Sequence, residues 1–205
     1  MKKVIILCAF LWSLQAVAQQ EETGVRSGFK KERLFTGGSV NVGFSNNLTM
    51  LGITPQLGYS ITNWADIGVN VNINYVSHRD YSEYGDKLRQ TTYGPGAFVR
   101  LFPVSFLFGT AQYEYNVIRQ KYIPANNGSF GSSTIQVQAN SLLVGGGYAG
   151  GRQPGNNSYY YISVMFDIAG DKYSPYIDEL GRSNPVIRAG YNIGLFQGRR
   201  SQLNN

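Results

Sequence analysis

The sequence predicts an all-β protein, an eight-stranded antiparallel up-and-down β-barrel that crosses a membrane. Residues 67–75 alternate strictly between apolar and polar or small side chains, which is the period of a β-strand. The polar face of this segment carries no charge, as in a confined interior rather than a surface in water. That face consists of Gly68, Asn70, Asn72 and Asn74. The chain is also rich in Gly, Tyr and Phe (25, 15 and 11 residues), and no apolar run after residue 18 is long enough for a transmembrane helix.

The predicted organisation begins with a signal peptide at residues 1–18. Lys2 and Lys3 precede an apolar stretch too short to span a bilayer, and residues 16–18 read Ala-Val-Ala, a small-residue cleavage site. An N-terminal anchor helix is the alternative, which the short apolar stretch disfavours. Cys8, the only cysteine, lies in this segment, so the mature chain would have no disulfide or thiolate metal site. A periplasmic segment (19–34), the barrel (35–197) and a periplasmic tail (198–205) are expected to follow.

The first four strands are expected at residues 36–44, 50–61, 67–75 and 91–102, where apolar residues recur at every second position. Two prolines interrupt this pattern, and each removes a backbone donor from the sheet. Gly94 and Gly96 flank Pro95, which predicts a bend or bulge there. Pro55 has no comparable explanation in the sequence.

The last four strands are expected at residues 106–118, 134–150, 159–169 and 186–196. The alternation continues without interruption in all of them except 134–150. In that segment the apolar phase changes between Ala139 and Leu142, which predicts a bulge at residues 140–142.

The connections differ in length between the two ends of the predicted barrel. Residues 63–64, 103–104 and 151–158 form short links, whereas 77–90, 119–133 and 170–185 form long ones, with 45–49 as a short exception. Short periplasmic turns and long outer loops are typical of outer-membrane barrels. Aromatic residues also gather near both ends of the apolar faces, as at membrane interfaces. They are Tyr59, Trp64, Tyr148 and Tyr160 at one end and Phe44, Tyr75, Tyr93 and Tyr115 at the other.

Over residues 36–196 the strand count, alternation and loop lengths resemble the small eight-stranded outer-membrane β-barrel family of the OmpA/OmpX type. Residues 188–195 are similar to the C-terminal assembly signal of such barrels, at Arg188, Gly190, Ile193 and Leu195. The resemblance implies a bacterial outer-membrane location, contact with its lipid, and recognition by the barrel-assembly machinery. The chain departs from the family in continuing beyond Phe196, where family members usually end. A soluble lipocalin-like barrel is the structural alternative, and the uncharged polar faces argue against it.

Four charged residues are predicted to face the interior: Arg100, Glu114, Asp167 and Arg188. Charges enclosed in a narrow lumen need partners, and an eight-stranded barrel is about filled by its own side chains. We therefore expect an ion-pair network that plugs the lumen, rather than a wide channel. The network serves either as structural neutralisation or as a gate for protons or small ions.

The outer loops carry aromatic residues that either contact a partner (a protein, a surface glycan or lipopolysaccharide) or cap the barrel mouth. They are Tyr81, Tyr84, Tyr122, Phe130, Tyr173 and Tyr176. His78, the only histidine, has no accompanying triad or metal-like set, so no catalytic residue, metal or cofactor is predicted. The formal net charge of +6 lies mainly in loops and termini of an exported chain, so no nucleic-acid partner is expected.

Three functions remain open at this point. The first is a non-enzymatic outer-membrane protein that acts through its outer loops or as envelope structure. A narrow pore or transport accessory is the second, and a lipid-modifying enzyme is the third.

Overall fold

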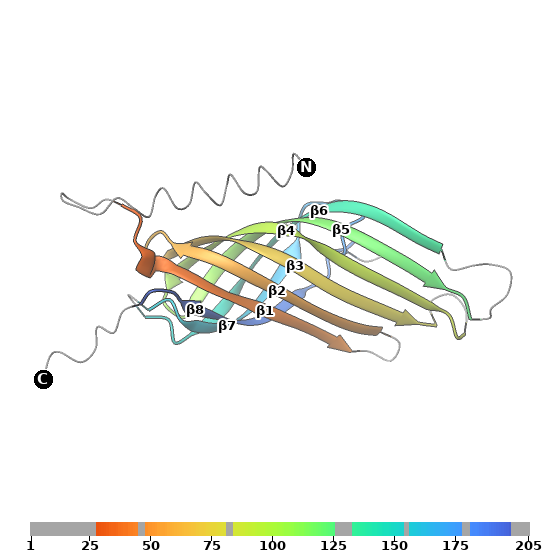
Figure 1. Cartoon of the computed structure of the whole chain (residues 1–205), viewed down its shortest axis with the longest axis horizontal. Coiled ribbons are helices and arrows are strands. Elements are labelled where there is room, and N and C mark those ends of the chain that lie inside the picture. Colours follow the sequence, from red (N-terminus) through yellow and green to blue (C-terminus); the bar gives the residue numbers. More distant parts are fainter. Residues whose placement is uncertain are drawn as a thin grey trace, which may run out of the picture.

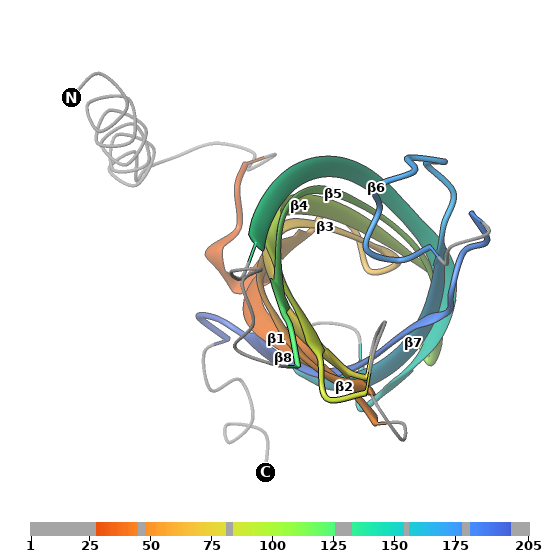
Figure 2. The same cartoon turned by 90° about the vertical axis from the view of Figure 1, so that its right-hand side faces the viewer.

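The computed structural model describes residues 28–44, 48–80, 84–125, 133–153, 156–177 and 181–197. It is a closed barrel in which each of eight strands pairs antiparallel with the next and β8 pairs with β1 (Figures 1 and 2). A short 3-10 turn, η1 (Lys31–Arg33), leads into the barrel. The strands are β1 (Leu34–Phe44), β2 (Leu48–Ser60), β3 (Ala65–Arg79), β4 (Lys87–Val104), β5 (Leu107–Ile123), β6 (Ser133–Gly150), β7 (Tyr159–Asp167) and β8 (Val186–Gly194). The predicted fold class is confirmed.

Apolar side chains face outward around the barrel, and polar side chains face inward. On β3, for example, Val69 is 57% exposed, whereas Asn72 is fully buried. Outward-facing Leu, Ile, Val and Phe residues recur on the other strands in the same way. An apolar surface of this extent does not suit water and is the lipid-facing surface of a membrane barrel. The lipocalin-like alternative, which needs the opposite orientation, is therefore wrong. Among the described residues, no helix has the length and apolar character needed to cross a membrane.

The two ends of the barrel differ. The turn end holds the links 61–64, 105–106 and 151–158, and the loop end holds the links 45–47, 80–86, 124–132 and 168–185. At the loop end, β3, β4, β5 and β6 extend well beyond β7 (Figure 1). β6 pairs with β5 from Ser133 to Tyr148 but with β7 only from Leu143 onward. A sheet therefore projects from one side of the barrel mouth, and parts of the predicted long loops are strand.

The bulge predicted at residues 140–142 is absent from β6. Its pairing with β5 runs from Tyr148 to Ser133 without a register shift. Ile135 and Val137 belong to the inward phase, but they lie beyond the end of β7, where no lumen encloses them. The apolar phase changes because the environment of the strand changes, and its backbone stays regular.

Neither proline introduces a bulge. Pairing between β2 and β3 lapses beside Pro55, and pairing between β4 and β5 lapses beside Pro95, yet each ladder resumes in the same register. The bulge predicted at Pro95 is therefore wrong, since each proline costs only local backbone pairing. Gly94 has a separate role, because a Cβ there would lie 1.7 Å from the carbonyl oxygen of Tyr115.

Candidate functional site

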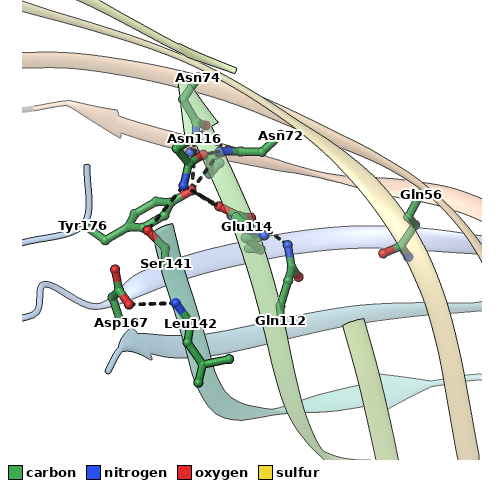
Figure 3. A network of polar contacts seen from close by, with 12 residues as sticks. Gln56, Asn72, Asn74, Gln112, Glu114, Asn116, Ser141, Leu142, Asp167 and Tyr176 are labelled. Carbon is green, nitrogen blue, oxygen red and sulfur yellow. Dashed lines mark hydrogen bonds and ion pairs between the residues drawn. The ribbon is translucent and has the colours of Figure 1, made fainter. Parts of the chain in front are cut away.

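The most extensive polar cluster of the described lumen surrounds Glu114 on β5, which is fully buried (Figure 3). Its carboxylate pairs with Arg188 on β8, with 2.9 Å between Oε1 and Nη2. It also accepts hydrogen bonds from the Gln112 amide at 2.7 Å and the Tyr176 hydroxyl at 2.6 Å. Because β5 and β8 are not neighbours in the barrel, the ion pair spans its interior.

Tyr176 comes from the connection between β7 and β8, which lies over the rim of the barrel in Figure 2. The residue is only 3% exposed, and its hydroxyl accepts hydrogen bonds from Asn72 at 2.9 Å and Arg188 at 3.2 Å. Its ring belongs to an apolar cluster with Leu143, Met165 and Val186. Of the two roles expected for the outer-loop aromatics, Tyr176 therefore fits the cap of the barrel mouth, and it is not available as a partner contact because it is anchored inside the mouth.

The asparagines of β3 connect this cluster by hydrogen bonds to strands β1 and β5 (Figure 3). Asn72 donates to Asn116 at 3.1 Å, and Asn74 donates to Asn72 at 2.8 Å. Asn41 of β1 donates to Asn74 at 2.9 Å. These amides act as hydrogen-bonding filler between strands. Asn70 differs, because its side-chain amide has no hydrogen-bond partner among the described residues.

Asp167 and Asp171 accept hydrogen bonds from backbone N–H groups of β6 that lie beyond the end of β7. Asp167 accepts hydrogen bonds from the backbone N–H of Leu142 at 2.9 Å and from the Ser174 hydroxyl. Asp171 accepts from the backbone N–H of Asn140 at 2.9 Å and of Tyr173 at 3.0 Å. These two backbone donors lower the pKa of Asp171 below its usual value. Asp167 was predicted to belong to an ion-pair network, and this is wrong, because its carboxylate binds backbone and hydroxyl donors instead of a cation.

A second cluster fills the turn end of the lumen. Arg100 donates to the Gln56 side-chain oxygen at 2.9 Å and to the Tyr159 hydroxyl at 3.4 Å. Its guanidinium carbon lies 4.4 Å from the ring centroid of Tyr161 and 4.6 Å from that of Phe98. Aromatic faces and neutral acceptors therefore surround this cation.

Asp66 and Arg152 complete the turn end, and neither is among the interior charges predicted from the sequence. Asp66 is fully buried and pairs with Arg152 at 2.9 Å, and it also accepts from the Tyr159 hydroxyl at 3.2 Å. The Arg152 guanidinium also lies 3.7 Å from the ring centroid of Phe102. Extending the alternation of residues 67–75 back by one position would have found Asp66. Arg152 lies in a turn, where no sequence pattern indicates that a side chain folds into the barrel.

A small cavity of about 10 Å³ separates the two clusters, with Ser39, Thr54 and Thr110 in its lining. Arg100 and Arg188 also line it, and Nε and Nη1 of Arg188 have no hydrogen-bond partner among the described residues. A space of this size accommodates about one water molecule. Of the four predicted interior charges, Glu114 and Arg188 form an ion pair with each other. Arg100 and Asp167 form no ion pair among the described residues.

The remaining predicted residues are dispersed. Tyr84 is 94% exposed and Tyr173 is 50% exposed, whereas the hydroxyl of Tyr122 donates to Asp86 at 3.0 Å. Tyr81 and Phe130 lie outside the described residues, as does the predicted signal peptide. His78 ends up near the loop end of β3, and the described chain contains no group of three or more His, Cys, Asp or Glu that could hold a metal ion.

Three of the predicted assembly-signal residues lie on β8, and the fourth, Leu195, directly follows this strand. Arg188 points into the lumen, and a Cβ on Gly190 would clash with the lumenal Tyr161. Ile193 faces outward, and the backbone N–H of Leu195 donates to Leu34 of β1 at 2.7 Å. Each residue thus has a place in the closed barrel, and its recognition by assembly machinery stays a prediction.

No protein-family model and no curated protein matches the chain. Solved structures with similarity include Ail, the attachment invasion locus protein of Yersinia pestis, in complex with the heparin analogue sucrose octasulfate, with a TM-score of 0.45 and 11% identity over 78% of this chain and 96% of Ail. Neisserial surface protein A gives a TM-score of 0.38 and 12% identity over 78% of this chain and 93% of its own. The N-terminal β-barrel domain of Pseudomonas aeruginosa OprF gives 0.37 and 12% over 78% and 95%. These weak likenesses are to β-barrel proteins.

Proposed function

We propose that this chain is a non-enzymatic integral protein of the bacterial outer membrane whose lumen is plugged. It acts as envelope structure or through the outer loops. The observation that carries this proposal is the cluster of Glu114, Arg188 and Tyr176, whose members come from β5, β8 and the β7–β8 connection and meet inside the barrel. Side chains from three elements then block the path that an ion would take.

The energetic argument supports a plug over a gate. Glu114 receives an ion pair and at least two hydrogen bonds, so its charge is compensated inside the barrel. A cavity of about 10 Å³ holds roughly one water, which is too small for a hydrated ion. Ion passage would require these contacts to break together.

Planar-bilayer recordings test the plug. We expect no resolved conductance from the wild-type protein. Tyr176→Ala should produce intermittent small openings, because it removes a buried ring and a hydroxyl bonded to Glu114. Tyr84→Ala is the matched control, since it removes an exposed tyrosine from the same end.

Regular ion steps from the wild type would overturn the plug and favour the narrow-pore alternative. The outer-membrane assignment has a separate test: the folded protein should fractionate with the outer membrane and show a heat-modifiable band on electrophoresis. Recovery in the soluble periplasmic fraction would contradict it.

A further inference from the structure

Five basic side chains gather on the outward face of the projecting sheet, and all are exposed. We call this group the cationic patch. It consists of Arg79 on β3, Lys87 and Arg89 on β4, and Arg119 and Lys121 on β5. Because successive side chains alternate between faces, these odd-numbered positions continue the outward rows that are apolar nearer the barrel centre.

Strand pairing brings these charges together. Arg79 lies directly opposite Lys87, and Arg89 lies directly opposite Lys121. Arg119 pairs with Thr91 and is therefore diagonal to Arg89. Like charges directly opposite each other destabilise a sheet, which is a cost that an external anion would offset.

Two described carboxylates adjoin the cationic patch along the chain, and each accepts a hydrogen bond from a group outside it. Asp80, next to Arg79, accepts from the Gly85 backbone N–H at 2.6 Å, and Asp86, next to Lys87, accepts from the Tyr122 hydroxyl at 3.0 Å. None of the five patch members forms an ion pair within the described part of the chain. The outward positions beside it on the flanking strands are uncharged, with Thr49 on β2 and Gln136 and Gln138 on β6. The patch is thus a concentrated positive surface that faces sideways from the barrel wall.

Outward tyrosines on the same three strands indicate where the cationic patch lies relative to the membrane. On each strand a patch arginine lies four positions nearer the loop end than an outward tyrosine. The pairs are Arg79 and Tyr75 on β3, Arg89 and Tyr93 on β4, and Arg119 and Tyr115 on β5. Four residues span about 13 Å along a strand, or roughly 10 Å along the membrane normal after tilt. Tyrosines favour the membrane interface, so the cationic patch lies at the level of the lipid headgroups.

We infer that the cationic patch binds the phosphate groups of a phosphorylated glycolipid in the outer leaflet. Clustered arginine and lysine beside a membrane attract anionic headgroups, and the planar guanidinium matches phosphate with paired hydrogen bonds. A soluble polyanion would approach the barrel from above and meet the loops first. A lipid headgroup in the leaflet approaches from the side, which is the direction that the patch faces.

Binding of bisphosphorylated lipid A in detergent micelles tests this inference on the full mature chain, with the same lipid lacking its phosphates as the comparison. Native mass spectrometry measures how much lipid stays bound. The wild type should retain the phosphorylated lipid preferentially, and added salt should weaken the binding. Arg89→Gln with Lys121→Gln should weaken it about thirtyfold, and Arg119→Gln alone about fivefold.

The controls separate charge from other effects. Arg89→Lys with Lys121→Arg keeps both charges and should bind within about twofold of wild type. Lys30→Gln with Lys31→Gln removes two charges at the turn end and should leave binding unchanged. Inorganic phosphate at millimolar concentration should not displace the lipid, since it lacks the acyl chains that hold the headgroup beside the barrel. Each variant is first checked for the heat-modifiable folded band.

Three outcomes would overturn the inference. One is equal retention of phosphorylated and dephosphorylated lipid by the wild type. Another is unchanged binding in both folded charge-removal variants. The third is displacement by inorganic phosphate, which would indicate a site for a free anion. Conductance is not involved in any of these readouts, so this test and that of the plug can fail independently.

Discussion

Removing the charge of Glu114 is the most direct test of how the lumen is held together. Glu114→Gln keeps the shape of the side chain but leaves the Arg188 guanidinium, 2.9 Å away, without a carboxylate. Breaking one partner of a buried ion pair costs about 3–5 kcal/mol. Because glutamine retains one oxygen that can accept from Arg188 or Tyr176, we expect the lower end of that range, about 3 kcal/mol.

A double-variant cycle isolates the ion pair. Arg188→Met alone leaves Glu114 with its hydrogen bonds from Gln112 and Tyr176, so about 2 kcal/mol of destabilisation is expected. Glu114→Gln combined with Arg188→Met leaves no uncompensated charge. The combined loss should therefore fall short of the sum of the two single losses by about 2 kcal/mol.

Equilibrium urea unfolding in lipid vesicles measures these free energies. Trp64 is the only tryptophan after residue 18 and reports on the turn end through its fluorescence. Glu32→Gln is the control, because this exposed carboxylate should contribute less than about 0.5 kcal/mol. The reasoning is refuted if Glu114→Gln costs less than 1 kcal/mol, or if the two losses simply add.

Three further predictions concern the loop end and the strand packing. Tyr176→Phe keeps the ring but removes the hydroxyl that donates to Glu114; we expect a loss of about 1–3 kcal/mol in urea unfolding and faster protease cleavage of the β7–β8 connection. The lowered pKa of Asp171 means that its carboxylate stabilises the fold above the ordinary carboxyl pKa and loses this effect as pH falls through the lowered value. The protection factor of the Asn140 amide, which compares its hydrogen-exchange rate with that of an unprotected amide at the same pH, should therefore fall in acid, and Asp171→Asn should show much less of this pH dependence. Gly94→Ala places a Cβ 1.7 Å from a backbone oxygen and should abolish the heat-modifiable band, whereas Gly109→Ala, whose nearest contact is at 4.0 Å, should assemble normally.

The sequence determined the wall of the barrel. Strict alternation in segments such as 67–75 sets which side chains face lipid, because a strand exposes successive residues to opposite faces. The same rule placed Glu114 and Arg188 in the lumen, and both are buried there. The ends of the strands could not be predicted from the alternation. The outward apolar rows give way to charged residues at Arg89 and Arg119, although both strands continue beyond these positions.

Only the tertiary structure decided which interior groups meet. Arg188 reaches Glu114 because closure of the barrel sets non-adjacent strands opposite each other, and no local pattern encodes that distance. Tyr176 and Arg152 lie in connections, where side-chain direction follows from the path of the backbone rather than from a two-residue period. The cationic patch likewise depends on strand register, which brings together charges that are separated along the chain. Periodicity is a local property that the sequence carries, whereas register and closure are properties of the assembled barrel.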